Sequence, residues 1–214
     1  MASDSTSILH HLEIPENHIP VNEIFYSIQG EGFHHGCPAF FIRFAGCDIG
    51  CIWCDSKDGW SVEESHFMPV EHIVKEAVSS DIGMVIITGG EPLIYNLQNL
   101  TEKLNQNKKK IHIETSGAYP LFASFDWLTL SPKKVKLPLE SYYSLANELK
   151  IIVNDESDLN FAQSQAKKIG TACHLFLQPQ WNQLKIMLPK IMDFIKANPE
   201  WRLSLQNHKF LGIK

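Results

Sequence analysis

The sequence predicts an α/β fold with a parallel sheet, arranged as an incomplete TIM-like barrel of about six βα units. Short apolar runs typical of strands alternate about six times with polar loops and helical patterns. The chain has 214 residues, whereas a complete eight-fold barrel usually takes ~250. An open sheet is the other arrangement that this pattern allows. Nearly every polar signal directly follows a strand, and parallel α/β folds bind ligands at the carboxyl ends of their strands.

Composition narrows the class of protein. Hydrophobic residues make up 44% of the chain and charged residues 20%, as in an ordinary globular domain. The net charge of -5 does not favour nucleic-acid binding, and no apolar run approaches the length of a membrane span. Five Cys, three of them clustered, do not suit a disulfide scaffold, so we expect a cytoplasmic protein in a reducing compartment.

The domain organisation is predicted to be simple. Residues 1–20 are polar and without periodicity, so we expect a mobile leader followed by a single domain over residues 21–214. The leader has no basic residue, and the first one in the chain is Arg43, which argues against a signal or transit peptide. The His10-His11 pair in the leader could bind a metal, but a solvated surface pair is the favoured interpretation.

The first half of the chain contains four predicted strands. They are expected at residues 21–27, 39–44, 84–88 and 111–114. The strand at residues 39–44 is nearly continuously apolar apart from Arg43, which is typical of buried strands in a parallel sheet. A helical stripe covers residues 69–79, with Pro69 near its first turn. The spacing of Leu97, Leu100 and Leu104 indicates a second helix.

The second half repeats the alternation. Strands are expected at residues 127–130, 148–153, 175–177 and 201–205. A helix opening at Asp155 would place Leu159, Ala162, Ala166 and Ile169 on one face before it ends at Gly170. Residues 187–197 are also expected to be helical, with Pro189 either starting or kinking the helix.

Three thiols, Cys47, Cys51 and Cys54, stand at spacings of x₃ and x₂ in the loop after the second strand. Closely spaced thiolates are typical ligands of zinc and iron–sulfur sites. A structural zinc site needs a fourth ligand, and Cys37, His34 and His35 are near in sequence. A site left with an open position would instead suit a catalytic metal centre. The spacing alone does not decide between the two.

Two further polar features admit two interpretations each. The loop of residues 29–32, Gln-Gly-Glu-Gly, is either a turn or a ligand loop in which Gly allows close backbone approach and Glu31 accepts hydrogen bonds. Arg43 lies in an apolar strand, where an unpaired guanidinium is costly, so it is expected to meet an anion. A salt bridge at the strand end is the commoner outcome. Cys37 and Cys173 are interpreted as ordinary free thiols.

Additional motifs carry a family resemblance. Trp53 precedes the third Cys of the cluster, and Gly-Gly-Glu-Pro follows a strand at residues 89–92. Together with the Cys spacing, these features resemble the radical S-adenosylmethionine (SAM) superfamily. The resemblance implies that three Cys hold a [4Fe-4S] cluster, whose fourth iron binds the amino and carboxylate groups of SAM. The Gly-Gly-Glu-Pro loop would contact the SAM amino group.

The resemblance narrows at residues 23–32, 43–47, 54–56 and 201–209, which are similar to the 7-carboxy-7-deazaguanine synthase family, and it runs from about Val21 to the C-terminus. It implies a lyase that converts 6-carboxy-5,6,7,8-tetrahydropterin to 7-carboxy-7-deazaguanine with loss of ammonia, toward queuosine. SAM would act as a regenerated cofactor. The family also uses Mg²⁺ and is typically homodimeric. The sequence does not identify the electron donor, for which we expect a flavodoxin-like protein.

The resemblance also implies roles for individual positions. Those that match substrate-binding residues are Ile28, Gln29, Gly30, Arg43 and Thr88, with Glu31 and His208 as further contacts. Those that match SAM-side residues are Trp53, Cys54, Asp55, Gly90, Ser116, Ser131, Pro132, Lys133 and Gln178. Ser56 stands where family members often have a Mg²⁺-binding Thr, and the C-terminal carboxylate of Lys214 would reach the substrate.

Two other functions are weighed against this one. A glycyl-radical-enzyme activase is also a short radical SAM enzyme, but it would not be expected to carry the Gln29–Gly32 loop or the His208 tail. A zinc-binding interaction module would use the three Cys structurally. It would contain one zinc and no iron.

Overall fold

The computed structural model describes residues 13–214 and divides them into two compact units. Unit 1 comprises residues 13–27, 38–114 and 119–126, and unit 2 comprises residues 28–37, 115–118 and 127–214. Each unit has its own sheet segment and its own helices. The His10-His11 pair and the first twelve residues of the expected leader lie outside the described residues.

Unit 1 is built on the strand order β3-β1-β2-β4-β5. These strands are β1 (His18–Ile28), β2 (Pro38–Phe44), β3 (Phe67–Pro69), β4 (Met84–Gly89) and β5 (Lys110–Thr115). β1 and β3 are antiparallel, whereas β2, β4 and β5 run parallel. Ile42, Ile87 and Ile113 have no exposed surface. The buried parallel strands predicted from their apolar runs are therefore confirmed.

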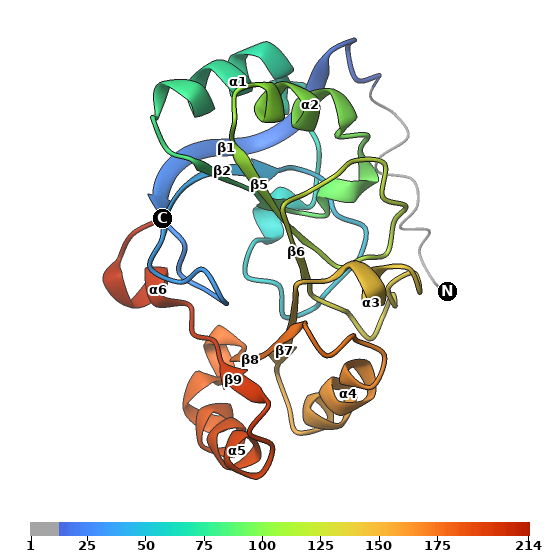
Figure 1. The fold of residues 1–214 in the computed structure, drawn as a ribbon, viewed down its shortest axis with the longest axis vertical. Helices are drawn as coiled ribbons and strands as arrows, with labels where there is room; N and C mark the ends of the chain where they lie inside the picture. The colour runs from blue at the N-terminus through green and yellow to red at the C-terminus, as the bar shows by residue number, and fades with distance from the viewer. Residues whose placement is uncertain (1–12) are drawn as a thin grey trace. The chain divides into compact units, whose positions relative to one another are not determined.

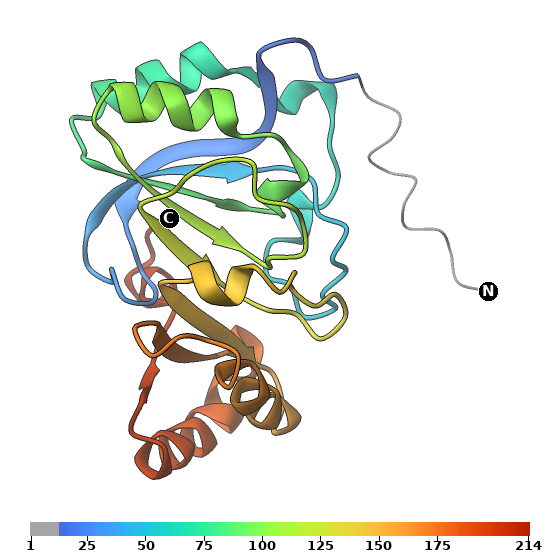
Figure 2. The same cartoon turned by 45° about the vertical axis from the view of Figure 1, so that its right-hand side comes forward.

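Two helices, α1 (Val70–Ser79) and α2 (Gln98–Gln106), lie side by side over this sheet (Figures 1 and 2). α1 begins directly after Pro69 and buries Val70, Ile73, Val74 and Ala77. This i, i+3, i+4, i+7 spacing is the apolar stripe of an amphipathic helix. Each large side chain so buried contributes roughly 1.5–3 kcal/mol. Three 3-10 turns, Lys57–Gly59, Glu64–His66 and Pro92–Ile94, shape the loops after β2 and β4.

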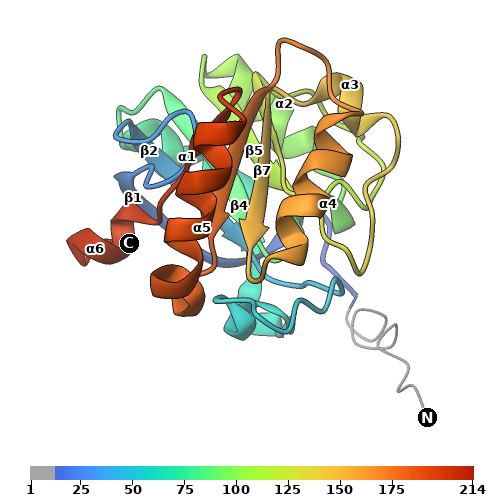
Figure 3. The same cartoon turned by 90° about the horizontal axis from the view of Figure 1, so that it is seen from below.

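Unit 2 carries four parallel strands in chain order. They are β6 (Trp127–Leu130), β7 (Glu148–Val153), β8 (His174–Pro179) and β9 (Trp201–Leu203). The helices are α3 (Tyr142–Leu145), α4 (Ser157–Ala166), α5 (Leu184–Ala197) and α6 (Asn207–Leu211), with a 3-10 turn at Trp181–Gln183. Figure 3 shows α4 and α5 on the same side of this sheet, where α4 packs on β7 and α5 on β8 and β9.

Several boundaries differ from the prediction. β1 begins at His18, so the last three residues of the expected leader belong to a strand. It pairs there with β3, which is too short to show an alternating pattern. α5 begins at Leu184 and contains Pro189 in its second turn. β5 is followed by a loop rather than a helix, and α6 was not predicted. None of the helices among residues 13–214 is long and apolar enough to cross a membrane.

Candidate active site

The Cys loop of unit 1 is tied to neighbouring backbone at both of its flanks. It leaves β2 at Phe44, and the Gly46 and Cys47 N–H groups donate to the carbonyls of Gly59 and Trp60 at 2.8 and 3.2 Å. Within the loop, the Cys54 N–H donates to the Cys51 carbonyl at 2.9 Å. These bonds fix the path of the backbone that carries the three thiols.

The three thiols interact but are not preassembled as a metal group. Cys47, Cys51 and Cys54 are partly buried and not in disulfides. Burial raises the pKa of Cys47 to about 11, and the nearby charges of Glu91, Cys51 and Cys54 act in the same direction. Within residues 13–214, no group of three or more His, Cys, Asp or Glu side chains is placed to hold a metal ion. Three soft sulfur donors on one loop nevertheless fit an iron–sulfur cluster chemically.

The Gly-Gly-Glu-Pro loop after β4 lies against the start of the Cys loop. The Gly90 N–H donates to the Phe44 carbonyl at 3.0 Å, and the Glu91 N–H donates to the Gly46 carbonyl at 2.9 Å. A Cβ on Gly90 would come within 2.1 Å of the Gly46 oxygen. The Glu91 side chain is buried and accepts from the Leu93 N–H at 3.1 Å. Glycine is therefore required where the two loops meet.

Two tyrosines also hold the Cys loop, and the sequence analysis did not anticipate them. The Tyr95 hydroxyl donates to the Ala45 carbonyl at 2.9 Å. The Tyr119 hydroxyl donates to the Asp48 carboxylate, next to Cys47. Burial is the main cause of the raised pKa of Tyr95, which keeps its hydroxyl protonated as a donor.

Arg43 and Thr88 are register partners on the parallel strands β2 and β4, so their side chains share a face of the sheet. The Arg43 Nε donates to the Glu23 carboxylate at 3.0 Å, and its guanidinium lies 5.5 Å from the centre of the Phe25 ring. The anion that Arg43 meets in the structure is thus a protein carboxylate, which is the salt bridge weighed in the sequence analysis. The Thr88 hydroxyl donates to Glu114 at 3.2 Å.

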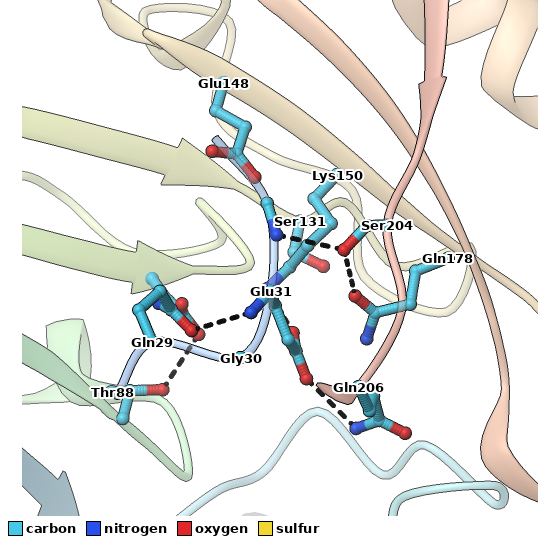
Figure 4. Close-up of polar contacts among 12 residues, drawn as sticks. Gln29, Gly30, Glu31, Thr88, Ser131, Glu148, Lys150, Gln178, Ser204 and Gln206 are labelled. Carbon is cyan, nitrogen blue, oxygen red and sulfur yellow. Dashed lines mark hydrogen bonds and ion pairs between the residues drawn. The ribbon is translucent and has the colours of Figure 1, made fainter. Parts of the chain in front are cut away.

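In unit 2 the loop of residues 29–32 places a carboxylate among polar partners. Glu31 Oε2 lies 2.6 Å from Lys150 Nζ, and Glu31 Oε1 accepts from Gln206 Nε2 at 3.1 Å. The Gln29 side-chain oxygen accepts from the Glu31 N–H at 3.0 Å. Figure 4 shows Lys150 and Gln206 around Glu31. The loop is therefore more than a solvated turn, because it presents a buried ionisable group.

The charge of Glu31 follows from these contacts. Burial raises its pKa, but the Lys150 ammonium, the hydrogen bonds from Lys150 and Gln206 and the charge of His208 together lower it further than burial raises it. The net pKa lies below the ordinary value for a glutamate. Glu31 is therefore a carboxylate at neutral pH, with the ability to accept hydrogen bonds from a ligand.

The C-terminal segment of unit 2 packs against the same loop. The Asn207 N–H donates to the Gly30 carbonyl at 3.1 Å, and a Cβ on Gly30 would lie 2.4 Å from His208 Nδ1. The Gly32 N–H donates to the Ser204 hydroxyl at 3.0 Å, and Ser204 in turn donates to Gln178 at 2.7 Å. Four predicted site residues, Gln29, Gly30, Glu31 and His208, are thus brought together with Gln178 linked to them.

The other predicted residues of unit 2 make local contacts of their own. Lys133 Nζ donates to the Ser131 hydroxyl at 2.7 Å, and Pro132 between them is buried. The Ser116 hydroxyl is buried and accepts from the Ala118 N–H at 3.3 Å. Ile28 and Lys214 are exposed. In unit 1, Trp53 and Ser56 are half-buried and Asp55 is exposed.

Several polar residues of these sites were not predicted from the sequence. They are Glu114, Glu148, Lys150, Ser204 and Gln206. A usable signal was present for two of them. Glu148 and Lys150 alternate within an apolar strand, and both are almost completely buried. Like Arg43, both are charged residues inside an apolar strand, where an unpaired charge is costly.

Comparisons with known proteins agree with these observations. The model of the Radical SAM superfamily matches residues 41–149. The 7-carboxy-7-deazaguanine synthase of Synechocystis sp. is 46% identical, covering 91% of this chain and 93% of that protein. That of Flavobacterium psychrophilum is 45% identical, covering 91% and 92%. The crystal structure of QueE from Escherichia coli matches with a TM-score of 0.76 at 29% identity, covering 96% and 99%.

The relationship extends over nearly the whole chain and includes both units. It confirms the α/β fold with a radical SAM core that the sequence predicts. Radical SAM enzymes use a [4Fe-4S] cluster and SAM, and the three-Cys loop supplies the sulfur donors that such a cluster needs. The chain is a radical SAM enzyme, and it belongs to the 7-carboxy-7-deazaguanine synthase family.

Proposed function

We propose that the protein converts 6-carboxy-5,6,7,8-tetrahydropterin to 7-carboxy-7-deazaguanine with loss of ammonia, as a step toward queuosine and other 7-deazaguanines. The observation that carries this proposal is the buried Glu31 carboxylate in a glycine loop packed against His208. A pterin ring offers several N–H donors on one edge, and a fixed carboxylate is a suitable acceptor for them.

The cofactor side of the site is proposed to use the three Cys and polar residues in loops that follow strands. Cys47, Cys51 and Cys54 would hold the cluster, which with SAM supplies hydrogen-atom transfer chemistry. Gly90 would present backbone to the SAM amino group, and its lack of a side chain allows the loop to pack closely against the Gly46 carbonyl. The further residues proposed to contact SAM are Trp53, Asp55, Ser116, Ser131, Pro132, Lys133 and Gln178.

The substrate side of the site is proposed to combine hydrogen-bond acceptors with one positively charged side chain, that of Arg43. Gln29, Gly30, Glu31 and His208 would surround the pterin, together with Ile28, Thr88 and the C-terminal carboxylate of Lys214. Arg43 would bind the substrate carboxylate. Its Nε already donates to Glu23, but a guanidinium carries five N–H donors. Arg43 is therefore able to bridge Glu23 and a second carboxylate.

Mg²⁺ is proposed to bind at Ser56. This residue follows Cys54 by two positions, and its N–H contacts the Cys54 sulfur at 3.4 Å. Ser56 precedes the 3-10 turn Lys57–Gly59 without capping it through its side chain. An oxygen ligand of this kind suits a hard cation. We further propose a cytoplasmic homodimer that takes electrons from a flavodoxin-like protein.

The test is anaerobic turnover. The cluster is reconstituted and reduced, SAM and 6-carboxytetrahydropterin are added, and mass spectrometry looks for 7-carboxy-7-deazaguanine. Product that disappears in Cys51→Ala supports the proposal. SAM cleavage without this product would overturn the substrate assignment in favour of an activase. One bound zinc with no iron would overturn the enzyme reading in favour of an interaction module.

A further inference from the structure

We propose that Lys150 is a positioning residue for substrate binding, which acts by holding the Glu31 carboxylate ionised and oriented toward the pterin. The inference rests on the proposed function and extends it to a residue of β7 outside the sequence motifs described above. Lys150 Nζ lies 2.6 Å from Glu31 Oε2, and their side chains are only 5% and 14% exposed. Taking two charges this far out of water carries a desolvation cost that can exceed their mutual attraction.

The location of the pair argues against a purely structural role. Lys150 lies in the middle of β7, where Leu149 and Ile151 on the opposite face are almost completely buried. An apolar residue at position 150 would fill the same space in the strand without the cost of removing a charge from water. Buried ion pairs seldom stabilise a protein more than apolar replacements do. The carboxylate partner stands on a loop, the kind of element that carries functional residues.

The orientation of Glu31 is fixed from several directions. Lys150 contacts one carboxylate oxygen and Gln206 donates to the other, while the Glu31 N–H donates to Gln29. The titratable groups that face Glu31 are Lys150 on β7 and His208 on α6. Glu148, also on β7, accepts from the Phe33 N–H at 3.1 Å in the next part of the loop. Lys150 is the strongest of the influences that keep Glu31 charged against the effect of burial.

Removing Lys150 would therefore leave a buried carboxyl whose neutral form is favoured. Neutral Glu31 carries a proton on one oxygen and loses part of its capacity to accept. The Lys150→Met variant is expected to bind 6-carboxypterin about tenfold or more weakly at neutral pH. Its binding should improve as pH rises, because Glu31 then ionises. The unaltered protein, in which Glu31 is already a carboxylate, should show only the pH dependence that His208 contributes, so the additional rise in Lys150→Met reports Glu31.

The experiment measures binding of 6-carboxypterin by fluorescence titration between about pH 5 and pH 8, where ordinary glutamates are already ionised. Lys109→Met is the matched control, because Lys109 is also a buried lysine but donates to the Ile82 carbonyl at 2.7 Å in unit 1. A binding profile that shifts in Lys150→Met and not in Lys109→Met supports the inference. Equal weakening at every pH in Lys150→Met would overturn it.

A second comparison covers the case in which Lys150→Met folds poorly. Glu31→Gln and the double variant Glu31→Gln/Lys150→Met both lack the buried carboxylate. If Lys150 acts through Glu31, the double variant should bind within about twofold of Glu31→Gln. A further large loss in the double variant would overturn the inference while leaving the proposed function intact. Failure of the unaltered protein to bind any 6-carboxypterin would instead overturn the proposed function itself.

Discussion

The backbone N–H of Glu91 donates to the carbonyl of Gly46 at 2.9 Å, which joins the Gly-Gly-Glu-Pro loop to the residue before Cys47. The same junction leaves no space for a side chain on Gly90. The loop proposed to bind SAM and the loop proposed to hold the cluster are therefore mechanically coupled inside unit 1. A substitution in either loop should therefore alter the conformation of the other.

Gly90→Ala should disturb the cluster loop as well as SAM binding. The new Cβ would meet the Gly46 oxygen at 2.1 Å and Cys47 Cβ at 3.2 Å. Overpacking of this kind costs about 1–3 kcal/mol of stability. We expect lower iron content after reconstitution and a lower Tm. Gly83→Ala is the control, because nothing lies within 4 Å of its added Cβ. Full iron loading of Gly90→Ala would contradict the coupling.

Gly30→Ala should displace the C-terminal segment from the loop of residues 29–32. Its Cβ would lie 2.4 Å from His208 Nδ1 and 2.9 Å from the His208 backbone nitrogen, which cannot rotate away. We expect binding of 6-carboxypterin to weaken at least about tenfold, with iron content unchanged. Gly170→Ala, whose added Cβ meets nothing within 4 Å, should bind normally. Normal pterin affinity in Gly30→Ala would refute the role of this contact.

Local sequence patterns predicted the fold better than they predicted the site. The strands at Trp127–Leu130 and Glu148–Val153 match their predictions end to end, because each is a short apolar run between polar loops. β3 was missed because it consists of three residues and depends on pairing with β1. The radical SAM motifs were found because their residues are close together in the sequence.

The polar partners of the site depend on contacts between distant residues. Gln206 and Glu31 are separated by 175 positions, and Lys150 and Glu31 by 119. No local period links such pairs, so only the fold reveals them. Arg43 shows the converse case. Its position in an apolar strand predicted an anionic partner, but sequence alone did not distinguish Glu23 from a substrate.

Asp126 should make a small acid-sensitive contribution to the stability of the protein. Burial raises the pKa of Asp126, but hydrogen bonds from Lys110 and from the Ile111 N–H lower it further. A carboxyl with a depressed folded pKa stabilises above its unfolded pKa of ~3.9 and loses that stabilisation as pH falls through the folded pKa. Because Asp126 is about one-third exposed, we expect its carboxylate to contribute under ~1 kcal/mol to the free energy of unfolding. Unfolding in urea at pH 7 and pH 2.5 should show Asp126→Asn less stable only at pH 7.

Ser56→Ala should separate Mg²⁺ dependence from cluster assembly. The Ser56 hydroxyl is the proposed Mg²⁺ ligand, whereas its contact with the Cys54 sulfur is made by the backbone N–H and survives the substitution. We expect iron content and SAM binding to remain normal, while the stimulation of product formation by Mg²⁺ is lost. Ser56→Thr retains the oxygen and should keep the stimulation. The measurement is the rate of 7-carboxy-7-deazaguanine formation across a Mg²⁺ titration. An unchanged titration curve in Ser56→Ala would move the cation to other ligands.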